Sequence, residues 1–312
     1  MINSKRILVT GGAGFIGSHL CDALIQSGNE IVVVDDLSSG YEENIAHLSE
    51  KIEFYEETIE TIDLRKIKKI NGVIHLAAQT SVPLSIENFR VSSRSNIDGS
   101  INVIDFCKNN QLPLVFASSS AVYGNLPRGD DTSLEIDLIS PYAVDKYSME
   151  LYAKMAHTVY QLPNIALRFF NVYGERQDPN SQYSGVISVF INQMNNDMEV
   201  TIHGGYQTRD FIYVSDVVNS IIGSMKLLYK EPISEQINIL TGKSTSIDDL
   251  FLMLAGHLDY RKKPNYTDLL VGDPIESGGT QLKLEDLLLW NPKDFTSLQN
   301  GLLKTINFQK NK

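Results

Sequence analysis

Three residues of the sequence form a candidate proton-transfer group. Tyr142 and Lys146 are four positions apart, and Pro141 suits the first turn of a helix, so both side chains are expected on one helix face. A tyrosine has a pKa of about 10 and is a poor base at neutral pH, but a nearby lysine cation favours its phenolate. Such a phenolate takes a proton from a hydroxyl group. Ser119 follows an apolar run and is expected to bond the same oxygen.

A glycine-rich turn, GGAGFIG (residues 11–17), is the second chemical signal, and it lies between a predicted strand and a predicted helix. Gly11 permits the tight turn, Gly14 lets a pyrophosphate approach the backbone, and Gly17 lets helix and strand pack closely. The helix N-terminus adds unpaired N–H groups. Asp35 ends the next apolar run and is placed for ribose hydroxyls. It favours NAD over NADP, because a carboxylate repels a 2′-phosphate.

The elements that would position these groups alternate through the first half of the chain. Continuous apolar runs separated by helix-like stretches are typical of parallel strands that are covered on both faces. They predict an α/β fold, a Rossmann doubly wound parallel sheet with right-handed crossovers. The predicted strands are Arg6–Thr10 and residues 31–34, 73–76, 114–117 and 165–170, and the first predicted helix covers residues 15–27.

The alternation ends after Asn171, where polar and glycine-containing stretches follow. We therefore expect an NAD-binding Rossmann domain over residues 1–172 and a smaller C-terminal α/β substrate-binding lobe over residues 173–312. Residues 211–229 look helical, so the segment 207–230 is expected to return to the first domain.

Composition narrows the class of protein. The 312 residues are 42% hydrophobic and 21% charged, which suits a folded core, and the net charge of −11 argues against binding nucleic acid. No apolar run of 18 residues predicts a membrane span, and residues 1–7 do not resemble a signal peptide. Cys21 and Cys107 lack metal-ligand spacing, as do the six histidines, so we expect no metal and a reducing, cytoplasmic setting.

Taken together, the motifs resemble one known family over nearly the whole chain. The matching stretches are VTGGAGFIG (residues 9–17), HLAAQ (75–79), ASSSAVYG (117–124), PYAVDK (141–146), RFFNVYG (168–174) and QTRDFIYV (207–214). They resemble the extended short-chain dehydrogenase/reductases, and specifically the nucleotide-sugar 4-epimerases of the UDP-galactose and UDP-N-acetylglucosamine type.

This resemblance implies that NAD lies along the glycine turn, the end of the second strand and the crevice next to the catalytic group. Asn96 is also expected to brace the catalytic helix, and Glu57 stands where an adenine-contacting Asp is common. The implied NAD-binding residues are Gly11, Gly14, Phe15, Ile16, Gly17, Asp35, Asp36, Ser38, Ser39, Gly40, Leu76, Ala77, Ala78, Asn96, Ser118, Tyr142, Lys146 and Phe169.

The resemblance likewise implies a UDP-sugar substrate. Asn171 and Arg209 are expected to contact its diphosphate, and Leu270 stands where such epimerases usually have an Arg. A large aromatic residue at the position of Ser277 admits only simple hexoses, so this serine favours N-acetylated sugars or both kinds. The implied substrate-binding residues are Ser81, Ser119, Ser120, Tyr142, Asn171, Gly185, Val186, Arg209 and Ser277.

The residues after Ser119 indicate the reaction. Related dehydratases and decarboxylases carry acidic residues there, whereas this chain has Ser120 and Ala121. The sequence therefore favours epimerisation at C4 through a transient 4-keto sugar, with catalytic residues Ser119, Tyr142 and Lys146. Two alternatives remain: a nucleotide-sugar oxidoreductase that releases NAD(P)H, and a non-catalytic NAD-binding subunit.

Family members commonly dimerise by packing two helices of each copy into a four-helix bundle. The helices expected here cover residues 96–108 and 142–160, so a homodimer is predicted. A helix buried within one copy would carry the same apolar stripe, which leaves the monomer open. The stripe residues are Ile97, Ile101, Ile104, Leu151, Met155 and Val159.

Overall fold

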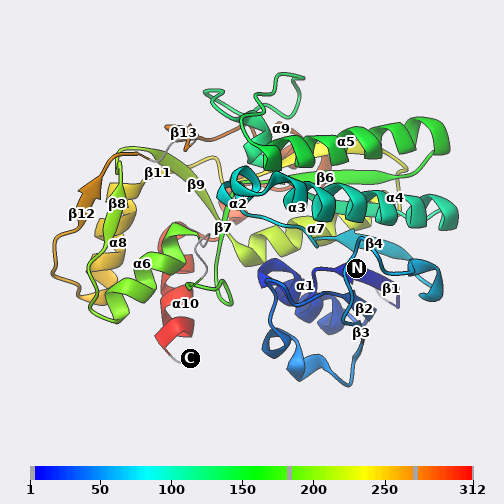
Figure 1. Ribbon diagram of the computed structural model, residues 1–312, viewed down its shortest axis with the longest axis horizontal. Helices are drawn as coiled ribbons and strands as arrows, with labels where there is room; N and C mark the ends of the chain where they lie inside the picture. The colour runs from blue at the N-terminus through cyan, green and yellow to red at the C-terminus, as the bar shows by residue number, and fades with distance from the viewer. Residues whose placement is uncertain (1–3, 181–184, 270–272, 311–312) are drawn as a thin grey trace. The chain divides into compact units, whose positions relative to one another are not determined.

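A computed structural model describes residues 4–180, 185–269 and 273–310 (Figure 1). The chain forms two compact units, and it crosses between them repeatedly. The first unit is Met1–Val122, Ser140–Arg168 and Val218–Ile237. The second is Tyr123–Ile139, Phe169–Val217 and Asn238–Lys312.

This division differs from the two continuous segments expected from the sequence. Tyr123–Ile139 belongs to the second unit, although it stands between two parts of the first. A segment does return to the first unit, but it is Val218–Ile237 rather than 207–230. It returns because its helix packs on the large sheet: a side chain added at Gly72 would meet Met225 and Tyr229.

The first unit is built on a sheet whose strand order is β10-β6-β5-β4-β1-β2-β3. The pairs β3–β2, β2–β1, β1–β4 and β4–β5 are parallel. This is the doubly wound Rossmann arrangement predicted from the apolar runs. The seven strands are β1 (Arg6–Thr10), β2 (Glu30–Val34), β3 (Ile52–Tyr55), β4 (Gly72–His75), β5 (Leu114–Ser119), β6 (Asn164–Phe169) and β10 (Ser234–Ile239).

Alternate strand residues point to opposite faces of this sheet, so both faces are buried. On one face, Leu8, Val73 and Phe116 join a core cluster with Phe106 and Met149 of two helices. The neighbouring residues on the same strands are equally buried, which explains why the runs are continuously apolar. The helices of this unit are α1 (Phe15–Gln26), α2 (Val82–Glu87), α3 (Phe89–Ser93), the π-helix η4 (Arg94–Asp98), α4 (Gly99–Asn110) and α5 (Pro141–Tyr160). Its short 3₁₀ turns are η1 (Glu42–Asn44), η2 (Ala46–Leu48), η3 (Leu64–Lys66) and η5 (Ser120–Tyr123), the last of which ends at the first residue of the second unit.

One predicted element was wrong at its start. Residues 211–213 form the end of a strand, β9 (Thr208–Tyr213), and the helix α7 (Val214–Leu228) begins only after them. The β-branched and aromatic residues of this stretch suit a strand, and pairing with β7 and β11 selects it. Strands β3 and β10 were not predicted.

The second unit contains a small sheet in which β9 pairs with three strands, and a separate pair, β8–β12. Phe251 packs edge-to-face against Phe190 and Tyr260, which joins helices α6 and α8. Its strands are β7 (Asn171–Tyr173), β8 (Thr201–His203), β9, β11 (Ser244–Ser246), β12 (Asn265–Thr267) and β13 (Glu276–Ser277). Its helices are α6 (Val186–Asn195), α8 (Ile247–Leu258), α9 (Leu282–Leu288), the 3₁₀ turn η6 (Pro292–Asp294) and α10 (Leu298–Lys310).

Two features are absent from residues 4–180, 185–269 and 273–310. No helix among them is both long and apolar enough to cross a membrane. Within the same ranges, no group of three or more His, Cys, Asp or Glu side chains could hold a metal ion.

Candidate active site

Helix α5 presents the predicted catalytic residues on its first turns. Ser140 caps the helix, because its hydroxyl accepts a hydrogen bond from the Ala143 N–H at 3.1 Å, and Pro141 occupies the first turn. Tyr142 and Lys146 follow one turn apart, and both are buried. The sequence therefore predicted this start of the helix correctly.

Strand β5 brings Ser119 to the same place, at its carboxyl end. Tyr142 and Ser119 share a side-chain hydrogen bond. The Lys146 Nζ atom lies 5.7 Å from the centre of the Tyr142 ring and donates to the Ala117 carbonyl at 2.9 Å. All three predicted catalytic side chains thus converge within the first unit.

The pKa of Tyr142 shifts in the direction opposite to the one expected from its lysine neighbour. Burial raises the pKa of Tyr142 to about 12; the bond to Ser119 opposes this rise, and Asp145 adds to it. Burial also lowers the pKa of Lys146 to about 8, against the influence of Asp145. Removal of the phenol from water is the largest cause of this shift, so Tyr142 is protonated at neutral pH in the protein without NAD.

Asp145 is a buried residue of this site that the sequence analysis missed. Its carboxylate accepts hydrogen bonds from the Ser93 hydroxyl at 2.7 Å, the Asn96 amide at 3.1 Å and the Ser92 hydroxyl at 3.3 Å. Asn96 in turn accepts from the Gln79 N–H at 2.8 Å. Asn96 therefore braces the catalytic helix, as expected, and the only signal for Asp145 was its place next to Lys146.

A second buried carboxylate fixes α5 on its other side. Glu150 accepts two hydrogen bonds from the Arg168 guanidinium, at 2.9 and 2.6 Å, and one from the Ser118 hydroxyl at 2.5 Å. The side chains of the ion pair are 4% and 8% exposed, so solvent screens it little. Ser118, predicted to bind NAD, thus has its hydroxyl engaged with the catalytic helix.

The glycine turn has the close backbone packing that a dinucleotide-binding turn requires. Gly11 has φ +73°, and a side chain there would meet the Ala77 nitrogen at 2.6 Å. A side chain at Gly17 would meet the Gly11 oxygen at 2.0 Å. Phe15 and Ile16 begin α1 directly after this turn, so the first N–H groups of the helix are available to phosphates.

Asp35 lies at the end of β2 and is 7% exposed. Its carboxylate accepts from the Ala13 and Leu37 N–H groups, each at 2.9 Å, and burial raises its pKa. Asp36 accepts from the N–H and the hydroxyl of Ser38 at 3.0 and 2.6 Å. The Asp35 carboxylate also accepts from the Gly14 N–H, which leaves one of its four acceptor sites for a ribose hydroxyl. Ser39 is exposed and Gly40 buried next to it.

Two further polar residues meet at the ends of β1 and β4. The Thr10 hydroxyl bonds His75 Nδ1 at 2.7 Å and accepts from the Ala77 N–H at 3.2 Å. His75 Nε2 bonds the Ser100 hydroxyl at 3.1 Å, and burial lowers the His75 pKa to about 3. A neutral His75 therefore links β1 to α4 and holds the strand end, where Leu76, Ala77 and Ala78 follow. Phe169, also predicted to contact NAD, is buried at the end of β6.

Strand β9 gathers the predicted substrate residues of the second unit. Arg209 is the register partner of Ser277 on β13, and the Asn171 amide donates to the Asp210 carbonyl at 3.3 Å. The Arg209 guanidinium forms an ion pair with Asp273 and donates to the Thr208 carbonyl at 2.7 Å. Residues that are 38 and 68 positions from Arg209 along the chain are thus brought next to its strand.

The other predicted substrate residues belong to other elements. Ser81 caps α2 by accepting from the Leu84 N–H at 3.0 Å, and Ser120 is half-buried directly after β5. Gly185 and Val186 begin α6. Leu270, where the resemblance expected an arginine, lies outside the described residues.

Comparison with known proteins shows the family. Residues 7–239 match the model of the NAD dependent epimerase/dehydratase family. The chain is 38% identical to a putative UDP-glucose 4-epimerase of Methanocaldococcus jannaschii, with 98% of each chain covered.

Solved structures of UDP-sugar 4-epimerases are similar to this chain in both sequence and fold. A UDP-glucose 4-epimerase of Thermotoga maritima with UDP-glucose has 36% identity and a TM-score of 0.91, covering 98% of this chain and 99% of that one. A UDP-N-acetylglucosamine 4-epimerase of Methanobrevibacter ruminantium, in complex with UDP-N-acetylmuramic acid, has 38% identity and a TM-score of 0.92 over 99% of both chains. A UDP-glucuronic acid 4-epimerase of Bacillus cereus, in complex with UDP-glucuronic acid and NAD, has 32% identity and a TM-score of 0.90 over 98% and 99%.

The chain therefore belongs to the NAD dependent epimerase/dehydratase family. It is an NAD-dependent enzyme of the epimerase class, an isomerase. The first unit has the features that NAD requires: a glycine turn without room for side chains, a helix N-terminus and a buried aspartate at the end of β2.

Proposed function

We propose that this enzyme inverts carbon 4 of a UDP-hexose and prefers the N-acetylated pair, UDP-N-acetylglucosamine and UDP-N-acetylgalactosamine, with UDP-glucose and UDP-galactose as further substrates. The relatives support the UDP-sugar class, since they act on UDP-glucose, UDP-N-acetylglucosamine and UDP-glucuronate. One observation carries the choice of sugar. Ser277 is small, and it pairs in register with Arg209, which is expected to hold the diphosphate.

The geometry of the first unit supports a proton transfer at the sugar. Tyr142 takes the proton of the 4-hydroxyl and later returns it, while Ser119 holds the same oxygen through a hydrogen bond. When bound, NAD supplies the acceptor and then the donor of hydride, together with a positive charge that favours the Tyr142 phenolate. Lys146 keeps a cation near the phenol, and the Ala117 carbonyl fixes its position.

The residues after Ser119 favour epimerisation over loss of water or of carbon dioxide. Ser120 and Ala121 begin the turn η5, and neither can donate or accept a proton as a carboxyl group would. The 4-keto sugar is therefore reduced again rather than losing a group at C5 or C6. Deuterium from heavy water appearing at C5 of the product would contradict this proposal.

The deciding experiment is a product assay without added NAD. Purified enzyme is incubated in parallel with UDP-N-acetylglucosamine, UDP-glucose and UDP-glucuronate, and the products are separated by chromatography. We expect conversion of the first two to their C4 epimers, with the N-acetylated sugar faster. Absorbance at 340 nm that rises in proportion to substrate would instead indicate an oxidoreductase that releases NADH, and the absence of any turnover with NAD bound would indicate a non-catalytic subunit.

We also propose a homodimer formed through α4 and α5. The predicted stripe is exposed within a single chain: Leu151 is 50% exposed and Val159 59%. Ile101 and Met155 are 38% and 40% exposed, whereas Ile104 packs against the core. An exposed apolar patch of this kind is typical of an interface. Light scattering at micromolar concentration should give twice the mass of one chain, and a single-chain mass would contradict the dimer.

The two cysteines support a reducing location, which we propose to be the cytoplasm. Cys21 and Cys107 are free and buried, and burial raises the pKa of the Cys107 thiol. Thiols kept reduced in this way are typical of cytoplasmic proteins. Fractionation of the producing cells would test the location.

A further inference from the structure

The segment Tyr123–Ile139 connects the strand that carries Ser119 to the helix that carries Tyr142, yet it belongs to the second unit. Within that unit, three of its residues are buried: Tyr123, Gly129 and Asp131. Buried polar groups must find hydrogen-bond partners, so their partners show what the segment holds in place.

Asn238 supplies most of those partners, and it is fully buried. Its side-chain oxygen accepts from the Tyr123 hydroxyl at 2.7 Å, and its backbone N–H donates to Asp131 at 2.8 Å. Its amide nitrogen donates to the carbonyls of Gly129 at 3.2 Å and Thr280 at 3.3 Å. The side chain therefore joins the segment Tyr123–Ile139 to the stretch that follows β13.

Direct bonds join the same two stretches. The Gly129 N–H donates to the Gly278 carbonyl at 2.9 Å, and the Thr280 N–H donates to the Gly129 carbonyl at 2.8 Å. The Thr280 hydroxyl also donates to Asp131 at 3.2 Å. A side chain at Gly279 would meet the Gly129 oxygen at 2.8 Å, so the backbones are in close contact. We call Tyr123, Gly129, Asp131, Asn238 and Thr280 the clamp.

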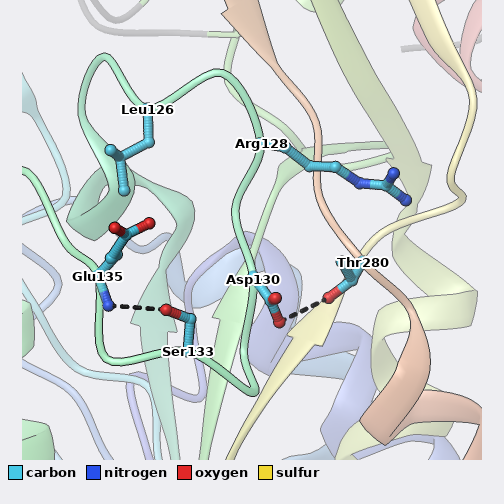
Figure 2. A pocket seen from close by; sticks show the side chains of 6 residues that line it. All are labelled: Leu126, Arg128, Asp130, Ser133, Glu135 and Thr280. Atoms are coloured by element: carbon cyan, nitrogen blue, oxygen red, sulfur yellow. Dashed lines mark hydrogen bonds between the residues drawn. The ribbon is translucent and has the colours of Figure 1, made fainter.

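Thr280 lines a cavity of about 340 Å³ together with Asp130 and Ser133. The Thr280 hydroxyl points toward the neighbouring Asp130 carboxylate (Figure 2) and donates to it at 3.5 Å, while Ser133 accepts from the Glu135 N–H at 3.0 Å within its own loop. Because Thr280 borders open space, a side chain of the same size can replace it without overpacking the core.

Ser277 is only three residues before Thr280. Its strand pairs with β9 on one side, and the clamp holds the chain directly after it. The backbone at Ser277 is therefore fixed at both ends. A side chain at this position cannot move away from a bound sugar unless one of the two attachments loosens.

We propose that the clamp determines sugar selectivity by fixing the position of Ser277, so that Thr280, Asp131 and Asn238 are positioning residues for the sugar site. This inference rests on the proposed function, because it takes Ser277 as the residue that faces the variable part of the sugar.

The test is a double-mutant cycle on the complete holoenzyme. Ser277→Tyr alone should lower kcat/KM for UDP-N-acetylglucosamine roughly tenfold or more, while UDP-glucose turnover changes little, because the ring fills the space for the N-acetyl group. Thr280→Val removes the hydroxyl bond to Asp131 at nearly constant volume. In the double variant Ser277→Tyr/Thr280→Val, kcat/KM for UDP-N-acetylglucosamine should be at least about threefold higher than in Ser277→Tyr alone. The two substitutions should not be additive, because the residues are coupled neighbours.

Two controls separate the clamp from general loosening. Ser133 lines the same cavity but has no hydrogen bond to the clamp among those described, so Ser133→Ala should not restore kcat/KM for UDP-N-acetylglucosamine in Ser277→Tyr. Tyr123→Phe removes the hydroxyl bond to Asn238 at the far end of the clamp, and it should reproduce the effect of Thr280→Val. Bound NAD, measured after denaturation, should be the same in all variants.

Amide hydrogen exchange gives a readout that does not depend on activity. The Gly129 and Thr280 N–H groups should exchange about tenfold faster in Thr280→Val and in Tyr123→Phe, but not in Ser133→Ala. If Ser277→Tyr leaves selectivity unchanged, the proposed role of Ser277 is wrong. A second outcome would contradict the role of the clamp. In it, Ser277→Tyr changes selectivity, but Thr280→Val has an additive effect on kcat/KM and leaves the exchange rates of Gly129 and Thr280 unchanged.

Discussion

The catalytic residues and the predicted sugar-binding residues are held in place by different means. Tyr142 and Lys146 lie on one helix, and buried carboxylates anchor that helix on two sides through Asp145 and Glu150. Arg209 and Ser277 lie on two short strands, which are held by strand pairing and, next to Ser277, by the side-chain hydrogen bonds of the clamp. The helix of Tyr142 and Lys146 is thus anchored by buried side-chain charge, whereas Arg209 and Ser277 depend on strand pairing and on the loop contacts beside their strands.

The largest effect is expected at the phenol. Tyr142→Phe removes the proton acceptor but keeps the ring, so kcat should fall roughly 10²- to 10⁴-fold, the usual contribution of a general base. KM and the amount of bound NAD should change little. Single-turnover chromatography on the holoenzyme measures this, and wild-type kcat in the variant would remove Tyr142 from the mechanism.

An intermediate effect is expected at Arg209 in the second unit, on KM rather than on kcat. Arg209→Lys keeps the charge but loses the planar fork of the guanidinium, so KM for the UDP-sugar should rise about tenfold, with kcat nearly unchanged. Bound NAD again serves as the control. A fall in kcat at constant KM would show that Arg209 acts on the reaction rather than on binding.

The smallest effect is expected at Asp145. It would sharpen the comparison most, because it separates the effect of the Asp145 charge on nearby pKa values from the structural role of its hydrogen bonds. Asp145→Asn removes a buried anion that raises the pKa of both Lys146 and Tyr142, so both pKa values should fall. The basic limb of the kcat profile, set by Lys146 with its pKa of about 8, should move to lower pH.

The control for that shift is Ser93→Ala, which removes one bond to Asp145 and leaves its charge. It should reduce stability without moving the limb. The other charged or titratable groups around Lys146 are unchanged in both variants: His75 from β4, Tyr142 from α5, and the Glu150–Arg168 pair from α5 and β6. If the basic limb of the pH profile of kcat does not move in Asp145→Asn, the role of Asp145 is structural alone.

Much of the first unit was predictable because its signals are local. Five of the seven strands of the large sheet, helix α1 and the start of α5 follow from apolar runs, from the glycine turn and from Pro141. The two missed strands lack such a signal. β3 has a polar residue within it, Glu53, and in β10 only the last residues are buried.

Asp145, Thr10 and His75 could not be found in the same way. Each looks ordinary in the sequence, and each acts through partners that are 25 to 67 residues away along the chain. The raised pKa of Tyr142 in the protein without NAD also did not follow from sequence, since the spacing of Tyr142 and Lys146 shows the cation but not the loss of water around the phenol.

The sequence by itself determined the Rossmann fold, the glycine turn for NAD and the placing of the candidate catalytic tyrosine and lysine on one helix face, because a helix repeat and a strand–turn–helix order place those residues without help from distant parts of the chain. Only the tertiary structure decided where the chain crosses between the units and which residues flank Ser277. Strand pairing and the partners of buried polar groups join positions far apart in the chain, such as Ser277 with Arg209 and Asn238 with Asp131, and no local pattern encodes such pairings.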